Sequence, residues 1–196
     1  MIAIVDYRAG NLVSVKKAVD HLGFASVITS DPAVVDSAEK VIVPGVGHFA
    51  ATSALTETGL RPAISRAIDR GVPFFGICVG MQWMFESSEE APDTSGLSLF
   101  PGQVTHFPTS VKSPHVGWNE LRVENSSRLL KGVPSGAFVY FTHSYRAPLV
   151  AGTVARCDYG GPFSAAIERD HLFGVQFHPE KSGDAGLTIL ENFCRL

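Results

Sequence analysis

Short apolar runs alternate with amphipathic segments through the first half of the chain. The apolar runs are rich in β-branched residues, as buried strands are, whereas the segments between them carry apolar residues at helical spacing. The predicted strands are 2–6, 25–30, 40–47 (broken by Pro-Gly) and 72–77, and the predicted helices are 11–23, 48–70 in two pieces, and one that starts with 78–86. This alternation predicts an α/β fold with a mostly parallel sheet covered by helices on both faces.

The pattern changes after residue 96. Short strand candidates follow one another there, separated by Gly, Pro and Ser clusters, which favours some antiparallel pairing. They are 102–107, 119–123, 137–141, 153–157, 164–168 and 172–177, and an amphipathic helix over 185–196 closes the chain. Because no linker-like segment divides the sequence, residues 1–196 are predicted to form one domain.

Composition narrows the class of protein. An apolar content of 45% and a charged content of 18% are typical of a folded globular domain. A net charge of -3 does not favour binding to nucleic acid or to anionic lipid. Three scattered cysteines favour free thiols in a reducing compartment. The N-terminus lacks the basic and apolar regions of a secretory signal, so a cytoplasmic location is expected.

One cysteine lies between two glycines, where an apolar strand gives way to a helix. Gly76 and Gly80 flank Cys78 at two residues on either side, which is the spacing of a nucleophile elbow. The start of a helix favours the thiolate, and the N–H of Val79 would point at a developing oxyanion, which is typically worth about 3–4 kcal/mol. The alternative is a buried structural cysteine, which is the interpretation we give to Cys157 and Cys194.

A nucleophilic thiol needs a base, and the stretch VQFHPEKS offers one. His178 and Glu180 follow an apolar strand with Pro179 between them, so Glu180 can hold the imidazole tautomer while His178 moves the proton. By itself this pair fits a surface turn equally well. An α/β sheet, however, gathers the carboxyl ends of its strands along one edge, which would bring His178 to Cys78.

The stretches GICVGMQ and FHPEK together resemble the class I glutamine amidotransferases, and the resemblance covers nearly the whole chain. It implies the flavodoxin-like fold of that family. It also implies hydrolysis of the glutamine side-chain amide through a thioester on Cys78, with His178 as the proton shuttle and Glu180 as its orienting group. The oxyanion pocket that it implies consists of Val79, Gly45, Val46 and Gly47.

Four further stretches, DYRAGNLVSV, PGVGHF, SPHVGWNEL and YFTHSYR, resemble the branch of this family that serves imidazole glycerol phosphate synthase in histidine biosynthesis. The resemblance implies a heterodimer with a (β/α)8 cyclase subunit, which uses the ammonia to form imidazole glycerol phosphate and an aminoimidazole carboxamide ribotide. No cofactor is implied. The positions matched to glutamine binding are Gly47, Gln82, Glu90, Ser144 and Tyr145. The positions matched to the partner interface are Asn11, Trp118, Asn119 and Lys181.

Several of these positions have plainer interpretations. Glu90 ends the acidic run ESSEE and would then be merely solvated, Trp118 would belong to the core, and Lys181 would be an exposed charge. The sequence also departs from the family pattern. Arg8 stands where a glycine is common, which leaves contacts of that loop open, and Val79 replaces the usual leucine but keeps its N–H.

Other functions remain as alternatives. Anthranilate synthase and the pyridoxal phosphate-forming lyase use glutaminases with the same triad, and the stretch PHVGWN weighs against both. A catalytically silent partner module and a cysteine peptidase are further possibilities. The histidines and cysteines lack metal-ligand spacing, so no metal is predicted. The two glycines of PGVG leave that loop free to change peptide orientation, which predicts that activity depends on the partner.

Overall fold

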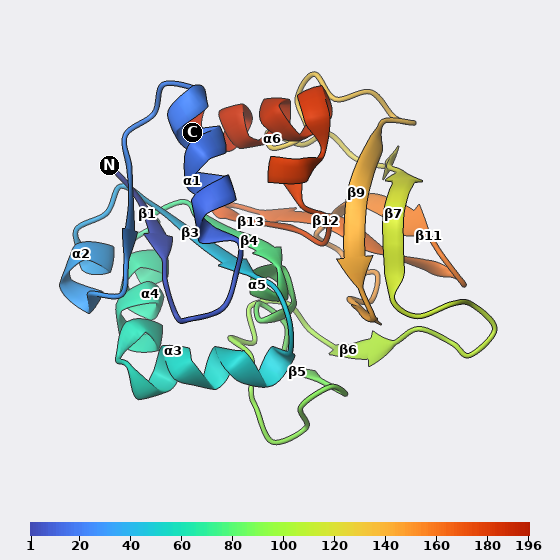
Figure 1. The fold of residues 1–196 in the computed structure, drawn as a ribbon, viewed down its shortest axis with the longest axis horizontal. Helices are drawn as coiled ribbons and strands as arrows, with labels where there is room; N and C mark the ends of the chain where they lie inside the picture. The colour runs from blue at the N-terminus through green and yellow to red at the C-terminus, as the bar shows by residue number, and fades with distance from the viewer.

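The computed structural model describes residues 1–196 and is built around an eight-stranded sheet (Figure 1). The strand order is β2-β1-β3-β4-β13-β12-β11-β8. The first five strands in this order are parallel, and the last three continue the sheet in antiparallel pairing. Their bounds are β1 (Ile2–Val5), β2 (Ser26–Thr29), β3 (Lys40–Gly45), β4 (Phe74–Cys78), β8 (Arg122–Val123), β11 (Thr153–Asp158), β12 (Pro162–Arg169) and β13 (Leu172–Val175). The predicted change from parallel to antiparallel pairing is confirmed.

Helices cover both faces of this sheet. Helices α1 (Leu12–His21) and α6 (Gly183–Arg195) lie together on one face, and α2 (Pro32–Asp36), α3 (Ser53–Glu57) and α4 (Leu60–Asp69) lie on the other (Figure 1). The predicted helical region 48–70 is indeed divided. The 3-10 turn η1 (Phe49–Thr52) leads into α3, and Gly59, with a left-handed φ of 76°, separates α3 from α4.

Two smaller β structures stand beside the main sheet. Strands β7 (His115–Glu120) and β9 (Phe138–His143) pair antiparallel as a ribbon at the antiparallel end, where β9 contacts α6 (Figure 1). Strands β10 (Tyr145–Arg146), β6 (Gln103–His106) and β5 (Ser87–Ser88) form a three-stranded sheet. Both structures lie close to the carboxyl end of β4, so they can contribute walls to a cavity there.

Three elements differ from the sequence-based expectation. The predicted strand 119–123 is divided between the end of β7 and β8, which belong to different sheets. Helix α5 (Val79–Gln82) is a single turn instead of a helix through residue 86. The N–H groups of Met84 and Phe85 already bond three residues back, and the N–H of Glu86 donates to the Gly102 carbonyl instead of to Gln82. The carbonyls of residues 83–85 in turn accept hydrogen bonds from residues 97–100. Strand β3 is not broken at Pro44, because Pro44 and Gly45 continue its pairing with β4.

The three cysteines are all free and buried. Burial raises the pKa of the Cys157 thiol and of the Cys194 thiol to about 12, which agrees with a structural role for both. None of the helices has both the length and the apolar character needed to cross a membrane.

Candidate active site

Cys78 sits at a strained turn between β4 and α5. Its φ of 54° and ψ of -109° are sparsely populated for any residue with a side chain. A Cβ on Gly76 would lie 2.5 Å from the carbonyl oxygen of Gly80, and a Cβ on Gly80 would lie 1.8 Å from that of Val43. Both flanking positions therefore require glycine because backbone approaches backbone, and the predicted elbow is present.

Parallel pairing brings His178 to this turn. Strand β13 pairs with β4 so that Val175 lies opposite Ile77, and the segment after Val175 therefore runs beside Cys78. The Nδ1 atom of His178 lies 3.0 Å from Oε1 of Glu180, and both side chains are almost fully buried. The 3-10 turn η2 (Pro179–Lys181), rather than strand alternation, sets this geometry.

The charge of His178 depends on its two neighbours. Burial by itself lowers the pKa of His178, but its interactions with Cys78 and with the Glu180 carboxylate outweigh that effect and raise the pKa to about 10. The Nε2 atom of His178 is buried and has no hydrogen-bond partner. With Nδ1 occupied by Glu180, Nε2 is the atom left for the Cys78 thiol. The arrangement favours the imidazolium form of His178 beside Cys78.

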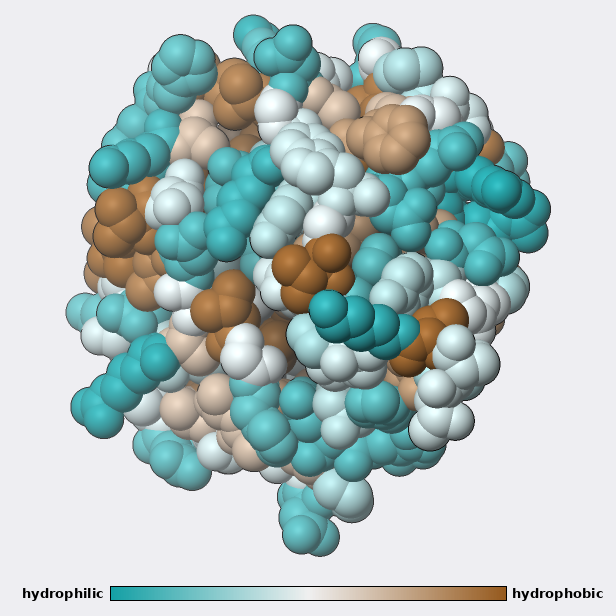
Figure 2. Space-filling model, turned by 45° about the vertical axis from the view of Figure 1, so that its right-hand side comes forward, coloured by the Kyte–Doolittle hydropathy of each residue, from teal (hydrophilic) through white to brown (hydrophobic).

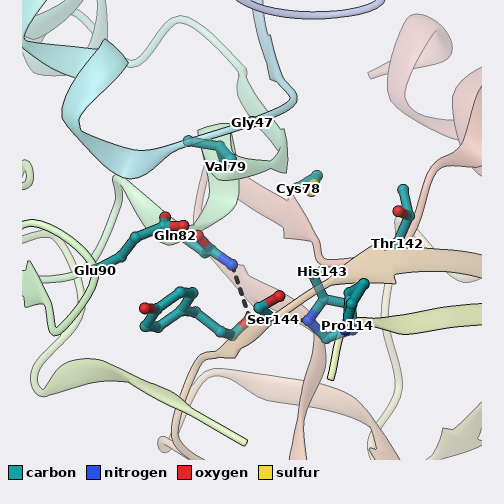
Figure 3. A pocket seen from close by; sticks show the side chains of 10 residues that line it. Gly47, Cys78, Val79, Gln82, Glu90, Pro114, Thr142, His143 and Ser144 are labelled. Carbon is teal, nitrogen blue, oxygen red and sulfur yellow. Dashed lines mark hydrogen bonds between the residues drawn. The ribbon is translucent and has the colours of Figure 1, made fainter. Parts of the chain in front are cut away.

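A cavity of about 200 Å³ opens beside Cys78 (Figure 3). Its size suits a ligand such as one amino acid and is small for a nucleotide. All five residues matched to glutamine binding line it, namely Gly47, Gln82, Glu90, Ser144 and Tyr145. No group of three or more His, Cys, Asp or Glu side chains is arranged to hold a metal ion.

Gln82 and Glu90 are fixed by the protein itself. The buried Gln82 uses both amide hydrogens, one on the Tyr145 carbonyl at 2.9 Å (Figure 3) and one on Oε1 of Gln176 at 3.1 Å. Only its carbonyl oxygen is thus left for a ligand. Oε2 of the half-buried Glu90 accepts from the Phe49 backbone N–H at 2.7 Å, so Glu90 is not merely a solvated charge.

The loop 45–47 lies directly against Cys78. Gly45 is opposite Cys78 in the β3–β4 pairing, and a Cβ on Gly45 would lie 2.3 Å from the Tyr7 hydroxyl oxygen and 2.8 Å from Val79 Cβ. Gly47 is exposed, has a left-handed φ of 97°, and would have nothing within 4 Å of a Cβ. The loop therefore has one crowded glycine next to the nucleophile and one free glycine at its outer end.

Sequence reasoning missed three residues of the site. Gln176 donates to Cys78 Sγ at 3.7 Å, the Tyr7 hydroxyl is buried near the same thiol, and His143 lines the cavity. Only Gln176 carried a usable signal, since it is a polar residue at the end of an apolar strand, two positions before His178. The position of Tyr7 in the site depends on how the segments after β1 and β3 pack together, and a single sequence does not reveal that packing.

Of the residues matched to a partner interface, Trp118 and Asn119 belong to the ribbon, Lys181 lies next to it, and Asn11 lies at the start of α1. Trp118 is 55% exposed, so its interpretation as core is wrong, and its ring lies 6.1 Å from that of Tyr140. Lys181 Nζ is 5.8 Å from the Tyr140 ring centre. Asn119 points to the opposite side of β7 from Trp118 and is half-buried. Asn11 is half-buried at the start of α1.

The face that carries the ribbon is only partly polar. Figure 2, which brings the side with β7 and β9 forward, shows apolar side chains separated by pale and polar ones. Val116 and Phe138 are 56% and 58% exposed on the outer side of the ribbon, together with Trp118. Exposed apolar side chains gathered on one sheet face are typical of an interaction surface.

Comparison with known proteins identifies the family. Residues 3–196 match the family model described as glutamine amidotransferase class-I. A protein named imidazole glycerol phosphate synthase subunit HisH from Moorella thermoacetica is 47% identical, with 100% of this chain and 94% of that protein covered. The protein of the same name from Methanothermobacter thermautotrophicus is 46% identical over 100% and 98% of the two chains.

Solved structures agree on the fold. A crystal structure described as a glutamine amidotransferase superimposes with a TM-score of 0.78 at 18% identity and covers 100% of both chains. The structure of PurLQS from Thermotoga maritima gives a TM-score of 0.75 at 20% identity, over 99% of this chain and 97% of that one. At these identities the likeness concerns the fold alone, which is that of the class I amidotransferases.

Proposed function

This chain belongs to the class I glutamine amidotransferases, and we propose that Cys78, His178 and Glu180 form its catalytic triad. The chain acts as the glutaminase subunit of imidazole glycerol phosphate synthase, in accordance with relatives 46–47% identical along its whole length. One observation carries the assignment of the triad. The strained Cys78 faces a buried His178–Glu180 pair with an Nδ1–Oε1 distance of 3.0 Å, at the edge of a cavity of about 200 Å³.

The reaction proceeds by nucleophilic catalysis. The Cys78 thiolate attacks the side-chain amide carbon of glutamine, and His178 protonates the departing ammonia, which leaves a γ-glutamyl thioester. His178 then takes a proton from water, which hydrolyses the thioester to glutamate. Glu180 accepts the Nδ1 hydrogen bond of His178 and keeps Nε2 directed at the reacting atoms.

Backbone N–H groups stabilise the oxyanion. Val79 is the first residue of α5, so its N–H has no partner within the helix and points toward the substrate. The loop Gly45-Val46-Gly47 supplies the second donor from the other side of Cys78. One donor of this kind is typically worth about 3–4 kcal/mol in the transition state, so the orientation of the loop controls the rate strongly.

The cavity recognises glutamine through polar groups from three segments. The carboxylate of Glu90 meets the substrate ammonium, and the Gln82 carbonyl oxygen accepts a second hydrogen bond. Gly47, Ser144 and Tyr145 supply backbone and hydroxyl donors for the substrate carboxylate. A glutamine lacking its ammonium group would leave Glu90 without its partner, which makes Glu90 the main determinant of specificity for an amino acid.

The ammonia is used by another subunit of the synthase. We assign that partner as a (β/α)8 cyclase in a heterodimer, with residues 1–196 acting as one domain in the cytoplasm. The outer face of the ribbon around Trp118 forms the contact together with Lys181 and Asn11, and Asn119 takes part through the strand that it shares with Trp118, on the inner side of that strand. The exposed aromatic and apolar side chains on this face support the assignment, since such side chains are common anchors of interfaces.

Alkylation by a chloroketone analogue of glutamine tests the triad and the cavity together. Mass spectrometry of the chain should show one adduct on Cys78 and none on Cys157 or Cys194, whose buried thiols stay protonated. Free glutamine should protect Cys78, and a chloroketone without the amino-acid group should react far more slowly. Equal rates with both reagents would favour a peptidase-like thiol, and no reaction with either would favour a silent module.

A further inference from the structure

A line of three hydrogen-bonded side chains, which the proposed mechanism does not use, connects the ribbon to the cavity. Nδ2 of Asn119 lies 3.3 Å from Nε2 of His115, and Nδ1 of His115 lies 3.1 Å from Nε2 of His143. Nδ1 of His143 lies 2.8 Å from the carbonyl oxygen of Tyr145. The same carbonyl holds Gln82 at 2.9 Å, so the line ends on the wall of the cavity.

The direction of this line is fixed by its two ends. A carbonyl oxygen only accepts, so the proton of His143 must be on Nδ1, and its Nε2 must accept. His115 therefore carries its proton on Nδ1 and accepts at Nε2 from the Asn119 amide, whose Nδ2 also donates to the Asp158 carbonyl at 3.2 Å. Every donor in the line has an acceptor. If the proton of one histidine moved to its other ring nitrogen, the proton of the other histidine would have to move as well.

The surroundings keep both histidines neutral and in place. Burial lowers the pKa of His115 to about 4 and that of His143 to about 3. The His115 ring is stacked between Tyr159, at 4.0 Å between ring centres, and Phe141, at 4.9 Å. Ring rotation and protonation are therefore both unfavourable, so the line has one arrangement at neutral pH.

We propose that His143, His115 and Asn119 are positioning residues that set the Tyr145 carbonyl, and through it Gln82, for glutamine binding. The inference deepens the proposed function and rests on it, since it concerns the same cavity. These side chains do not touch the reacting atoms. They act by holding a carbonyl that would otherwise turn with the short strand β10.

The position of Asn119 couples this line to the ribbon surface. Trp118 and Asn119 are adjacent on β7 and point to opposite sides, Trp118 outward and Asn119 toward His115. A cyclase that binds at Trp118 therefore contacts the strand that carries Asn119, the outer residue of the line. Partner binding should then change the affinity for glutamine as well as the rate of hydrolysis, and glutamine should change partner affinity by the same factor.

The substitution Asn119→Asp tests the line because it replaces a donor by an acceptor of the same shape. At saturating cyclase, we expect KM for glutamine to rise about tenfold, the equivalent of one hydrogen bond, with a much smaller change in kcat. Asn119→Leu removes the donor without adding charge and should raise KM in the same direction. Asn192→Asp is the matched control, since Asn192 is also half-buried and donates to two backbone carbonyls, at 2.9 and 2.7 Å, far from the cavity.

Nitrogen-15 NMR of the histidine rings in the free chain gives a readout that does not need activity. The wild type should show His115 and His143 neutral and protonated at Nδ1, and Asn119→Asp should move the proton of His115 to Nε2. The line is refuted if either ring carries its proton on Nε2 in the wild type, or if KM is unchanged in both Asn119 variants while the wild-type complex hydrolyses glutamine. A wild-type complex without glutaminase activity would instead overturn the proposed function. The NMR result would still test the hydrogen-bonded line, because it does not depend on activity.

Discussion

Replacing Tyr7 by phenylalanine should stabilise the protein. The Tyr7 side chain is 2% exposed, and its hydroxyl is a buried group with no hydrogen-bond partner. Burial raises the pKa of Tyr7, and the nearby Cys78 raises it further, so the hydroxyl stays neutral and gains nothing from ionisation. No protein group pairs with this hydroxyl in place of the hydration that it has in the unfolded chain, and phenylalanine has the same shape without the unpaired group.

The size of the effect follows from two opposing contributions. Leaving a buried polar group unpaired costs about 1–3 kcal/mol, whereas removing one oxygen atom opens only a small void and loses a few contacts. We therefore expect Tyr7→Phe to raise the free energy of unfolding by about 1 kcal/mol. For a chain of this length, that corresponds to an increase in Tm of about 2–4 °C.

Thermal unfolding of the isolated chain, followed by circular dichroism, measures this change. Tyr159→Phe is the matched control, because the Tyr159 hydroxyl donates to the Lys112 carbonyl at 2.7 Å and its loss should lower stability. The two substitutions remove the same atom and should shift Tm in opposite directions. A lower Tm for Tyr7→Phe would refute the reasoning, since it would mean that the Tyr7 hydroxyl has a partner in the folded state.

Three further predictions concern the elbow, the triad and the ribbon. Gly80→Ala places a Cβ 1.8 Å from the Val43 carbonyl oxygen. It should lower the free energy of unfolding, measured with urea, by about 3 kcal/mol and abolish thioester formation. A variant as stable as the wild type would contradict this. The folded pKa of His178, about 10, lies above its unfolded value near 6.5, so the stability it contributes is complete below pH 6.5 and is lost as pH rises through 10. Glu180→Gln should flatten that decline in the free energy of unfolding measured against pH, and an unchanged slope would count against the ion pair. Trp118→Ala should leave the stability of the free chain within about 0.5 kcal/mol but weaken cyclase binding by about 2 kcal/mol in calorimetry, and unchanged affinity would place the interface elsewhere.

Features that depend on residues close together in the chain could be predicted from the sequence. Apolar runs located the parallel strands, and the glycines around Cys78 predicted a turn whose close backbone contacts are now visible at Gly76 and Gly80. The spacing of His178 and Glu180 predicted a pair, which the structure shows at 3.0 Å. These features follow from residues close together in the chain, so one sequence is enough to propose them.

Features that depend on distant segments were missed or misjudged. Helix α5 ends after one turn, where the N–H of Glu86 donates to the carbonyl of the distant Gly102 instead of to that of Gln82, and nothing in the helical pattern of 78–86 indicates this. The line from Asn119 to Tyr145 depends on the pairing of β7 with β9, where His115 lies opposite His143. Without that register, the two histidines are unrelated positions 28 residues apart.

Glutamine hydrolysis is the most direct test of the central claim. The purified chain should be assayed alone and with the cyclase subunit and its nucleotide ligand, with Cys78→Ala as the control. We predict low activity alone, a strong increase in the complex, and none in the variant, because we propose that the loop 45–47 completes the oxyanion pocket only when the partner is bound. A wild-type complex that releases no glutamate, or a Cys78→Ala complex that still does, would contradict the account.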